Sequence, residues 1–285
     1  MTRFPSELTK SPWEPILARV LGMSEVTRPV PLPVPSPVSL PVPLPLSGRT
    51  YSSQRKVRLG DVTPKGRVRL DAVARYLQDI ATDDSLDGNY SEPHSWVVRR
   101  TEMWVSAFPK YLEELHLTTW CGALGSHWAE RRTQIATASG VAIETAALWV
   151  RVDFKTMKPA PLSSDLVELL SSATGGRKVS ARLEIGRSLP PLDSHNSVSQ
   201  DWSIRRSDMD AVGHLNNAVY WEVLEEYLGA QTRKLAGLHA TVEHHGAIDP
   251  GDSVRIVTQE IDTRVLLRHV LDTGEVAAVT QLIFA

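Results

Sequence analysis

A short segment of the chain, residues 207–226, concentrates polar side chains that could carry out chemistry. It reads SDMDAVGHLNNAVYWEVLEE, with two aspartates, a Gly-His pair and two asparagines ahead of an apolar-periodic run. The periodic run predicts a helix, and Asp and Asn often cap helices by binding local N–H groups. A helix start also gathers unpaired N–H donors and the positive end of the helix dipole. A carboxylate and an imidazole placed there could therefore act on a bound substrate.

The composition is that of a globular protein without a charged binding tract. The 285 residues are 42% hydrophobic and carry a net charge of −2, so nucleic acid and anionic membranes are not expected as partners. No run approaches the roughly 18 apolar residues of a membrane span. The single cysteine, Cys121, excludes an intramolecular disulfide framework and fits a reducing compartment, so we expect a cytoplasmic protein.

The first 50 residues differ from the rest of the chain. Eight of the 19 prolines fall between Pro29 and Pro45, a density that forbids helix and favours polyproline II. We therefore predict a disordered, proline-rich arm over residues 1–50.

The remainder contains an internal repeat. Residues 58–81 overlay residues 205–228 without a gap, and both segments predict a strand, a turn and a helix. The overlay aligns Asp61 with Asp208, Gly66 with Gly213, Leu77 with Leu224, and Gln78 with Glu225.

Each predicted helix is followed by strand-like runs with alternating apolar residues and short connections, which predict antiparallel meanders. The runs cover residues 95–108, 114–122, 126–138 and 141–154 in the first copy, and 239–246, 252–261, 263–272 and 275–285 in the second. The chain is thus predicted to be α+β. We place the first unit at residues 51–175, a linker at 176–200 and the second unit at 201–285.

The repeat, with D-x-D-x-x-G-H-x-N-N-x-x-Y opening the second helix, resembles the hot-dog fold thioesterases. It is most similar to the acyl-acyl carrier protein (ACP) thioesterases over residues 52–285. The residues in register are Asp208, Asp210, Gly213, His214, Asn216, Asn217, Tyr220 and Glu225. The resemblance implies two tandem hot-dog units, each a long helix wrapped by an antiparallel sheet. It also implies hydrolysis of fatty acyl-ACP thioesters in fatty acid biosynthesis, with ACP as the partner and no cofactor; a homodimer is left open.

Carried over by this resemblance, the family's catalytic aspartate and histidine correspond to Asp210 and His214. Two features of the plant enzymes are absent: Val212 stands where they have Asn, and Ala247 and Ile248 stand where they have a Glu-Cys pair. A cysteine-dependent mechanism is therefore excluded. A mechanism centred on Asp210 stays open, because simpler hot-dog thioesterases work with that one carboxylate.

Thioester hydrolysis needs a nucleophile for the carbonyl carbon and donors for the oxyanion. Asp210 could activate a water as general base or attack directly to give a mixed anhydride, and the sequence allows both. We expect backbone N–H groups around Asn217 and Ala218 to bind the oxyanion. Gly213 would let the backbone approach closely, and His214 could orient Asp210 or the water.

The role of the missing glutamate could pass to another side chain. Strand side chains alternate, so Glu243 and His245 are expected on the same face as Ala247, with His244 on the other face. Either Glu243 or His245 could then reach the groove of Asp210 as an acid or base.

Other polar residues of the motif have structural alternatives. Asp208 is expected to cap the helix start or to support the site, and Asn216 to brace the turn. Glu225 lies in mid-helix and could be a paired core carboxylate or a partner of the catalytic residues. We expect no metal site, because the histidines lack ligand spacing.

The two copies differ where the chemistry is expected. In the first copy Asp210, His214, Asn216 and Asn217 are replaced by Thr63, Arg67, Arg69 and Leu70. We therefore predict that the second copy is catalytic and that the first shelters the acyl chain. An acyl-CoA thioesterase and a non-catalytic acyl-thioester binding protein remain the alternatives.

Overall fold

The computed structural model describes residues 42–90, 96–153, 155–156, 158–185, 189–192, 197–232 and 235–284. Most of the arm expected over residues 1–50 lies outside these described residues. The first copy contains β1 (Thr50–Lys56), α2 (Leu70–Asp87), β2 (Trp96–Val105), β3 (Glu114–Leu124), β4 (Trp128–Thr137) and β5 (Gly140–Asp153). The segment between the copies holds β6 (Lys158–Pro159) and α3 (Ser164–Ser171). The second copy contains β7 (Ser197–Trp202), α4 (Val219–Ala230), β8 (Leu238–His244), β9 (Val254–Ile261), β10 (Arg264–Leu271) and β11 (Val276–Phe284).

The eight meander strands and the two long helices expected from the sequence are confirmed, with ends displaced by a few residues. The strand expected at the start of residues 58–81 and of residues 205–228 is wrong, because short helical turns, Leu59–Asp61 and Arg206–Asp208, lie there. Strands β1 and β7 and helix α3 were not expected. The two strands read TYSSQRK and SVSQDW and are the outermost strands of the sheet. Because an edge strand buries little of its surface, its sequence shows little of the apolar alternation that identifies a strand.

All main strands join one antiparallel sheet in the order β1-β3-β4-β5-β2-β8-β11-β10-β9-β7. Counted outward from the centre of the sheet, the strands are β2-β5-β4-β3-β1 in the first half and β8-β11-β10-β9-β7 in the second. Corresponding strands of the two copies therefore occupy equivalent places, and the copies are related by approximate two-fold symmetry. They meet where β2 pairs with β8, from Arg100 opposite Glu243 to Val105 opposite Leu238. This is the α+β arrangement expected from the repeat.

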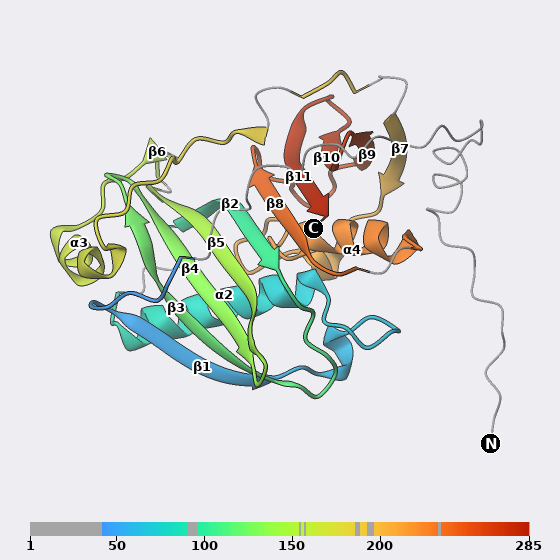
Figure 1. Ribbon diagram of the computed structural model, residues 1–285. Helices are drawn as coiled ribbons and strands as arrows, with labels where there is room; N and C mark the ends of the chain where they lie inside the picture. The colour runs from blue at the N-terminus through green and yellow to red at the C-terminus, as the bar shows by residue number, and fades with distance from the viewer. Residues whose placement is uncertain are drawn as a thin grey trace.

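Helices α2 and α4 pack on the same face of this sheet, as Figure 1 shows. Apolar side chains of both helices, among them Ile80 and Leu224, belong to one continuous core with strand residues such as Ile143 and Leu267. Burial of this face supplies the main driving force for folding of both halves together.

The two helices run antiparallel, because the middle of each lies beside the start of the other. Glu225, in the middle of α4, accepts a hydrogen bond from Leu70 N at 2.7 Å. Gln78, in the middle of α2, donates from Nε2 to Asn216 Oδ1 at 3.0 Å. The aligned residues Gln78 and Glu225 therefore each reach the start of the other helix, Glu225 as an acceptor from a backbone N–H and Gln78 as a donor to a side-chain oxygen.

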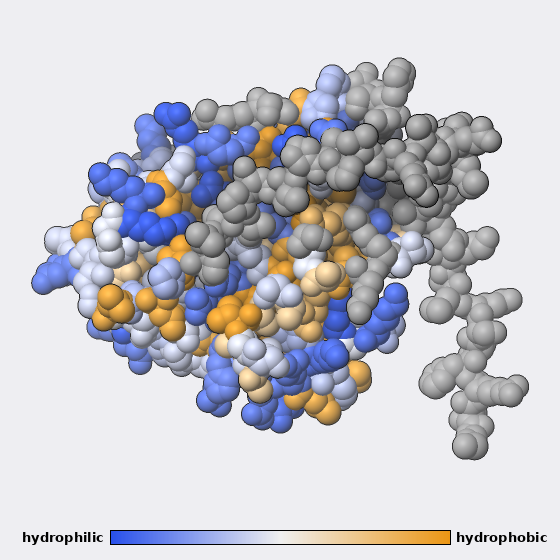
Figure 2. All heavy atoms as spheres, in the orientation of Figure 1, coloured by the Kyte–Doolittle hydropathy of each residue, from blue (hydrophilic) through white to orange (hydrophobic). Residues whose placement is uncertain are grey.

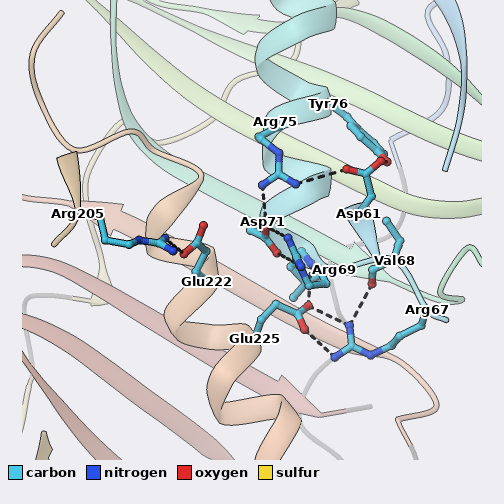
Figure 3. Close-up of polar contacts among 11 residues, drawn as sticks. Asp61, Arg67, Val68, Arg69, Asp71, Arg75, Tyr76, Arg205, Glu222 and Glu225 are labelled. Atoms are coloured by element: carbon cyan, nitrogen blue, oxygen red, sulfur yellow. Dashed lines mark hydrogen bonds and ion pairs between the residues drawn. The ribbon is translucent and has the colours of Figure 1, made fainter. Parts of the chain in front are cut away.

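An ion pair reinforces one of these two contacts. Arg67 binds the Glu225 carboxylate with both terminal nitrogens, at 2.9 and 2.8 Å, and Figure 3 shows this fork between the two copies. Glu225 is 7% exposed and Arg67 is 18% exposed. The pair is shielded from water and connects the first helix-start turn to the second helix.

Two histidines lie buried beneath α4. His244 on β8 and His269 on β10 are in the same row of the sheet, because both align with Ala278. The Tyr220 ring packs against both, at 4.6 Å and 4.8 Å between ring centroids. Among the described residues, neither ring nitrogen of His269 has a hydrogen-bond partner. Burial lowers the pKa of each imidazole to about 3, so both are neutral at neutral pH.

The opposite face of the second half is covered by the segment between the copies. Arg268 donates to Pro190 O and Gln259 donates to Pro191 O, each at 2.8 Å. On the face of the molecule seen in Figure 2, hydrophobic and hydrophilic residues are interspersed. No helix among the described residues is long and apolar enough to cross a membrane.

Removing one charge of the buried pair should weaken folding strongly. We expect Glu225→Gln to lower the free energy of unfolding by about 3 kcal/mol, because the Arg67 charge stays shielded without its partner. The control is Glu222→Gln, since the Glu222 partner Arg205 is 60% exposed, and its cost should stay under about 1 kcal/mol. Urea unfolding measures the free energy of unfolding of both variants. Equal decreases would show that the Arg67–Glu225 pair stabilises the fold no more than an exposed ion pair does.

The buried histidines should make the protein sensitive to acid. Burial lowers the pKa of His269 in the folded state, so between pH 6.5 and about 3 this histidine is protonated in the unfolded chain and neutral in the folded chain. Stability is thus complete above pH 6.5 and falls as the pH drops. We expect His269→Leu to flatten this fall in melting temperature between pH 7 and 5, and exposed His116→Gln to leave it unchanged. A wild-type slope retained in His269→Leu would contradict the assignment.

Candidate active site

The turn before α4 has a backbone frame that the first copy repeats. Asp210 N donates to His214 O at 2.9 Å, and Gly213 N donates to Asp210 O at 3.0 Å. In the first copy Thr63 N donates to Arg67 O at 2.9 Å, and Gly66 N donates to Thr63 O. Gly213 has a φ of +92°, a backbone conformation that favours glycine. The aligned glycines are therefore explained by the turn itself.

The Asp210 carboxylate sits inside this turn. Its Oδ1 accepts hydrogen bonds from Val212 N at 2.9 Å and Gly213 N at 3.1 Å. No donor to Oδ2 is found within the part of the chain that the structure describes. Thr63 forms the same turn without a carboxylate. The backbone conformation of the turn therefore does not explain why residue 210 is an aspartate.

His214 does not contact the Asp210 carboxylate through its imidazole. Its side chain is 45% exposed, and Nε2 lies 3.7 Å from Asp249 Oδ1. Burial raises the pKa of the Tyr220 hydroxyl, and the charges of Asp210 and Asp249 raise it further. The approach of Asp249 to His214 places Asp249 in this polar cluster, although the sequence motif does not contain it.

Asn216 braces the start of α4, as expected. Its Oδ1 accepts from Ala218 N at 2.8 Å and from Gln78 Nε2 at 3.0 Å. The expectation that Ala218 N binds an oxyanion is therefore wrong, because this N–H is already used inside the turn. Asn217 N has no acceptor among the described residues and remains available.

Asn217 lines a cavity whose other walls come mainly from the first copy. The cavity runs between α2, the start of α4 and the inner face of the first half-sheet. Its lining residues are Ala74, Leu77, Gln78, Val98, Thr101, Arg131, Thr133, Thr145, Ala147, Trp149, Asn217 and Trp221. The mixture of apolar walls and a few convergent polar groups is typical of a ligand site.

A charged cluster packs beside the sheet wall of this cavity. Arg131 pairs with Asp84 at 2.6 Å and donates to the Tyr90 hydroxyl at 3.1 Å. Asp84 also pairs with Arg49 at 2.8 Å. The Arg131 charge is therefore balanced inside the protein, and the cavity does not depend on a ligand for its neutralisation.

Asp208 has a structural role in both copies. It is 4% exposed, and its Oδ2 accepts from Arg205 N at 2.8 Å. The aligned Asp61 accepts in the same way from Arg58 N at 3.1 Å. Both aspartates are the last residue of a short helical turn, Leu59–Asp61 in the first copy and Arg206–Asp208 in the second. Asp208 therefore supports the site only indirectly.

Glu243 and His245 share a face, as expected, but this face is the one opposite α4. Glu243 accepts from Glu184 N at 2.7 Å and Ile185 N at 3.1 Å, and His245 Nε2 lies 3.7 Å from Glu243. The expectation that Glu243 points into the groove of Asp210 is therefore wrong. His244, which the sequence pattern set aside, faces Tyr220 instead.

The error arises where the strand ends. β8 stops at His244, so strand alternation cannot be extended from Glu243 to Ala247. Beyond that point the chain turns, Ala247 is exposed, and Ile248 is buried with its carbonyl accepting from Leu215 N at 3.0 Å. The position of the family's Glu-Cys pair thus packs against the turn that carries Asp210.

Sequence reasoning missed Gln78, Asp249 and the cavity tryptophans. The alignment of Gln78 with Glu225 was a signal for Gln78, since both side chains cross to the partner helix. Asp249 and the tryptophans reach the site only through tertiary packing and carry no signal of their own.

Comparison with known proteins agrees with this architecture. Residues 48–170 match the acyl-ACP thioesterase N-terminal domain, and residues 193–283 match the C-terminal domain. An uncharacterized protein of Mycobacterium tuberculosis, Rv2001, is 28% identical over 79% of this chain and 88% of its own length. The chloroplastic acyl-[acyl-carrier-protein] hydrolase FATB2 of Cuphea viscosissima is 24% identical over 71% of this chain and 56% of its own.

A solved structure shows the same fold. The 12:0-ACP thioesterase of Umbellularia californica superposes with a TM-score of 0.67 and 18% identity, covering 84% of this chain and 98% of that one. The two-unit fold is therefore that of the hot-dog thioesterases. Because the two domain matches together span most of the sequence, the chain belongs to the acyl-ACP thioesterase family.

Proposed function

We propose that the protein hydrolyses fatty acyl-ACP thioesters to a free fatty acid and the carrier thiol. One observation carries this proposal: Asn217, whose N–H has no acceptor among the described residues, lines a partly apolar cavity of the first copy and follows the turn that holds Asp210. Family membership supports thioester hydrolysis, and the similarity to FATB2, an acyl-[acyl-carrier-protein] hydrolase, supports ACP as the carrier. Fatty acid biosynthesis in the cytoplasm is the setting that this substrate would imply.

In this proposal Asp210 supplies the nucleophile. Acting as a general base, it takes a proton from water while the hydroxide attacks the carbonyl carbon and the thiolate leaves, to be protonated as the thiol. Acting directly, the Asp210 carboxylate attacks the carbonyl carbon and displaces the thiolate, which is protonated to the thiol, and water then cleaves the resulting mixed anhydride to the fatty acid and free Asp210. The second oxygen, Oδ2, suits either route because Oδ1 is held by the backbone. Hydrolysis in H₂¹⁸O under single-turnover conditions separates the routes, since only the anhydride route can place ¹⁸O in the Asp210 side chain.

The start of α4 would stabilise the developing charge. Asn217 lines the cavity at the helix start, and in this proposal its N–H donates to the oxyanion there, where the helix dipole favours an anion. The partly exposed His214, held near Asp249, is placed to orient water at the mouth of the site. The acyl chain would extend along α2 and the first half-sheet, which gives the first copy its role as a shelter.

The carrier and the activity can be tested together. Purified protein should release free thiol from acyl-ACP thioesters with a higher kcat/KM than from the matching acyl-CoA thioesters. Equal or higher values for acyl-CoA would overturn the assignment of the carrier. Tight binding of acyl-ACP without any thiol release would instead identify a non-catalytic binding protein.

Substitution at the two aligned turn positions tests the location of the site. Asp210→Asn keeps an oxygen for the backbone N–H groups but loses the negative charge, so turnover should fall at least about 10²-fold, with stability changed by less than about 1.5 kcal/mol. Thr63→Val, at the aligned position of the first copy, should leave turnover within a few-fold. Steady-state kinetics and thermal melts measure both; full activity in Asp210→Asn would sink the proposal.

A further inference from the structure

The two helix-start turns differ in which side chain reaches them from the other copy. At the start of α2, Glu225 places its carboxylate on Leu70 N at 2.7 Å. Leu70 occupies the position that Asn217 occupies in the second copy, because the repeat aligns them without a gap. A carboxylate oxygen thus already occupies, in the first copy, the place where an oxyanion would bind in the second.

This occupied position is complete by itself. Arg67 neutralises the Glu225 carboxylate through two hydrogen bonds, and Figure 3 shows the carboxylate lying between Arg67 and the start of α2. The Glu225 carboxylate uses Leu70 N and both terminal nitrogens of Arg67, so these donors are not left for a substrate. The start of α2 therefore shows how a helix start in this fold binds a negatively charged oxygen.

The second helix start is reached by a neutral amide instead. Gln78 Nε2 donates one hydrogen to Asn216 Oδ1 at 3.0 Å, and Gln78 and Asn217 line the same cavity. An amide nitrogen has two hydrogens, so the second can be donated to a ligand atom in that cavity. The Gln78 amide is neutral, so it attracts the Asn217 N–H less strongly than the Glu225 carboxylate attracts Leu70 N–H.

We infer that Gln78, supplied by the first copy, is a catalytic residue of the second-copy site. Its Nε2 donates to the thioester carbonyl oxygen together with Asn217 N–H, and its neutrality keeps that N–H available. The inference rests on the proposed function and adds a second oxyanion donor to it. It also makes the first copy a part of the reaction centre rather than only a shelter for the acyl chain.

The decisive variant is Gln78→Glu, which copies the first-copy arrangement into the second. Its carboxylate should bind Asn217 N–H and repel the developing oxyanion, lowering kcat at pH 8 by about 10²-fold or more. Because protonation removes the charge, the ratio of variant to wild-type kcat should rise as the pH falls from 8 to 5. Because Gln78 also donates to Asn216 Oδ1, thermal melts at the same pH values show whether a change in kcat follows a change in folding.

Two further variants complete the test. Gln78→Met keeps the length of the side chain and removes the donor, so kcat should fall by about 10-fold or more while KM changes little. Thr82→Glu adds the same charge one turn further along α2, at an exposed position, and should leave kcat and its pH profile as in the wild type. Thermal melts establish that each variant is folded, and Gln78→Met still decides if Gln78→Glu does not fold.

The outcomes separate this inference from the proposed function. An active wild type with unchanged kcat in Gln78→Met or in folded Gln78→Glu would overturn the role of Gln78 and leave thioester hydrolysis intact. A wild type without any thioesterase activity would overturn the proposed function itself.

Discussion

The antiparallel contact of α2 with α4 is the constraint on which the rest of the molecule depends. The helices pass each other so that the middle of each meets the start of the other, through Glu225 on Leu70 and Gln78 on Asn216. A helix start carries unpaired N–H groups and attracts negative charge. Whatever side chain crosses from the partner helix therefore decides whether that start is filled or open.

The approximate symmetry of the fold thus gives two equivalent helix starts, and different side chains reach them. In the first copy the Glu225 carboxylate and Arg67 fill the helix start with an internal ion pair. In the second copy a neutral glutamine reaches the helix start, Asn217 lines the cavity, and its N–H has no acceptor among the described residues. The filled start contributes to stability through a shielded charge pair, while the second start is reached by a neutral amide.

Pairing of β2 with β8 imposes the second constraint. Because one sheet runs through both copies, the position of a side chain along its strand fixes whether it faces the helices or the segment between the copies. Glu243 faces that segment and binds its backbone. His244 faces α4, where it must stay neutral under Tyr220 together with His269.

The sequence by itself determined the repeat, the α+β class, the long strands and the turn with Asp210, because these follow from local periodicity and turn chemistry. It also separated Asp208 from Asp210: only the first is repeated, and it is the one that caps a helical turn in both copies. Edge strands β1 and β7 escaped detection, since they bury too little to show alternation. Only the tertiary structure decided that Ala218 N is already bonded, that Glu243 faces away, and that Gln78 and Asp249 join the site. These facts depend on where a strand ends and on how two helices cross, and such contacts between distant residues leave no periodic trace in the chain.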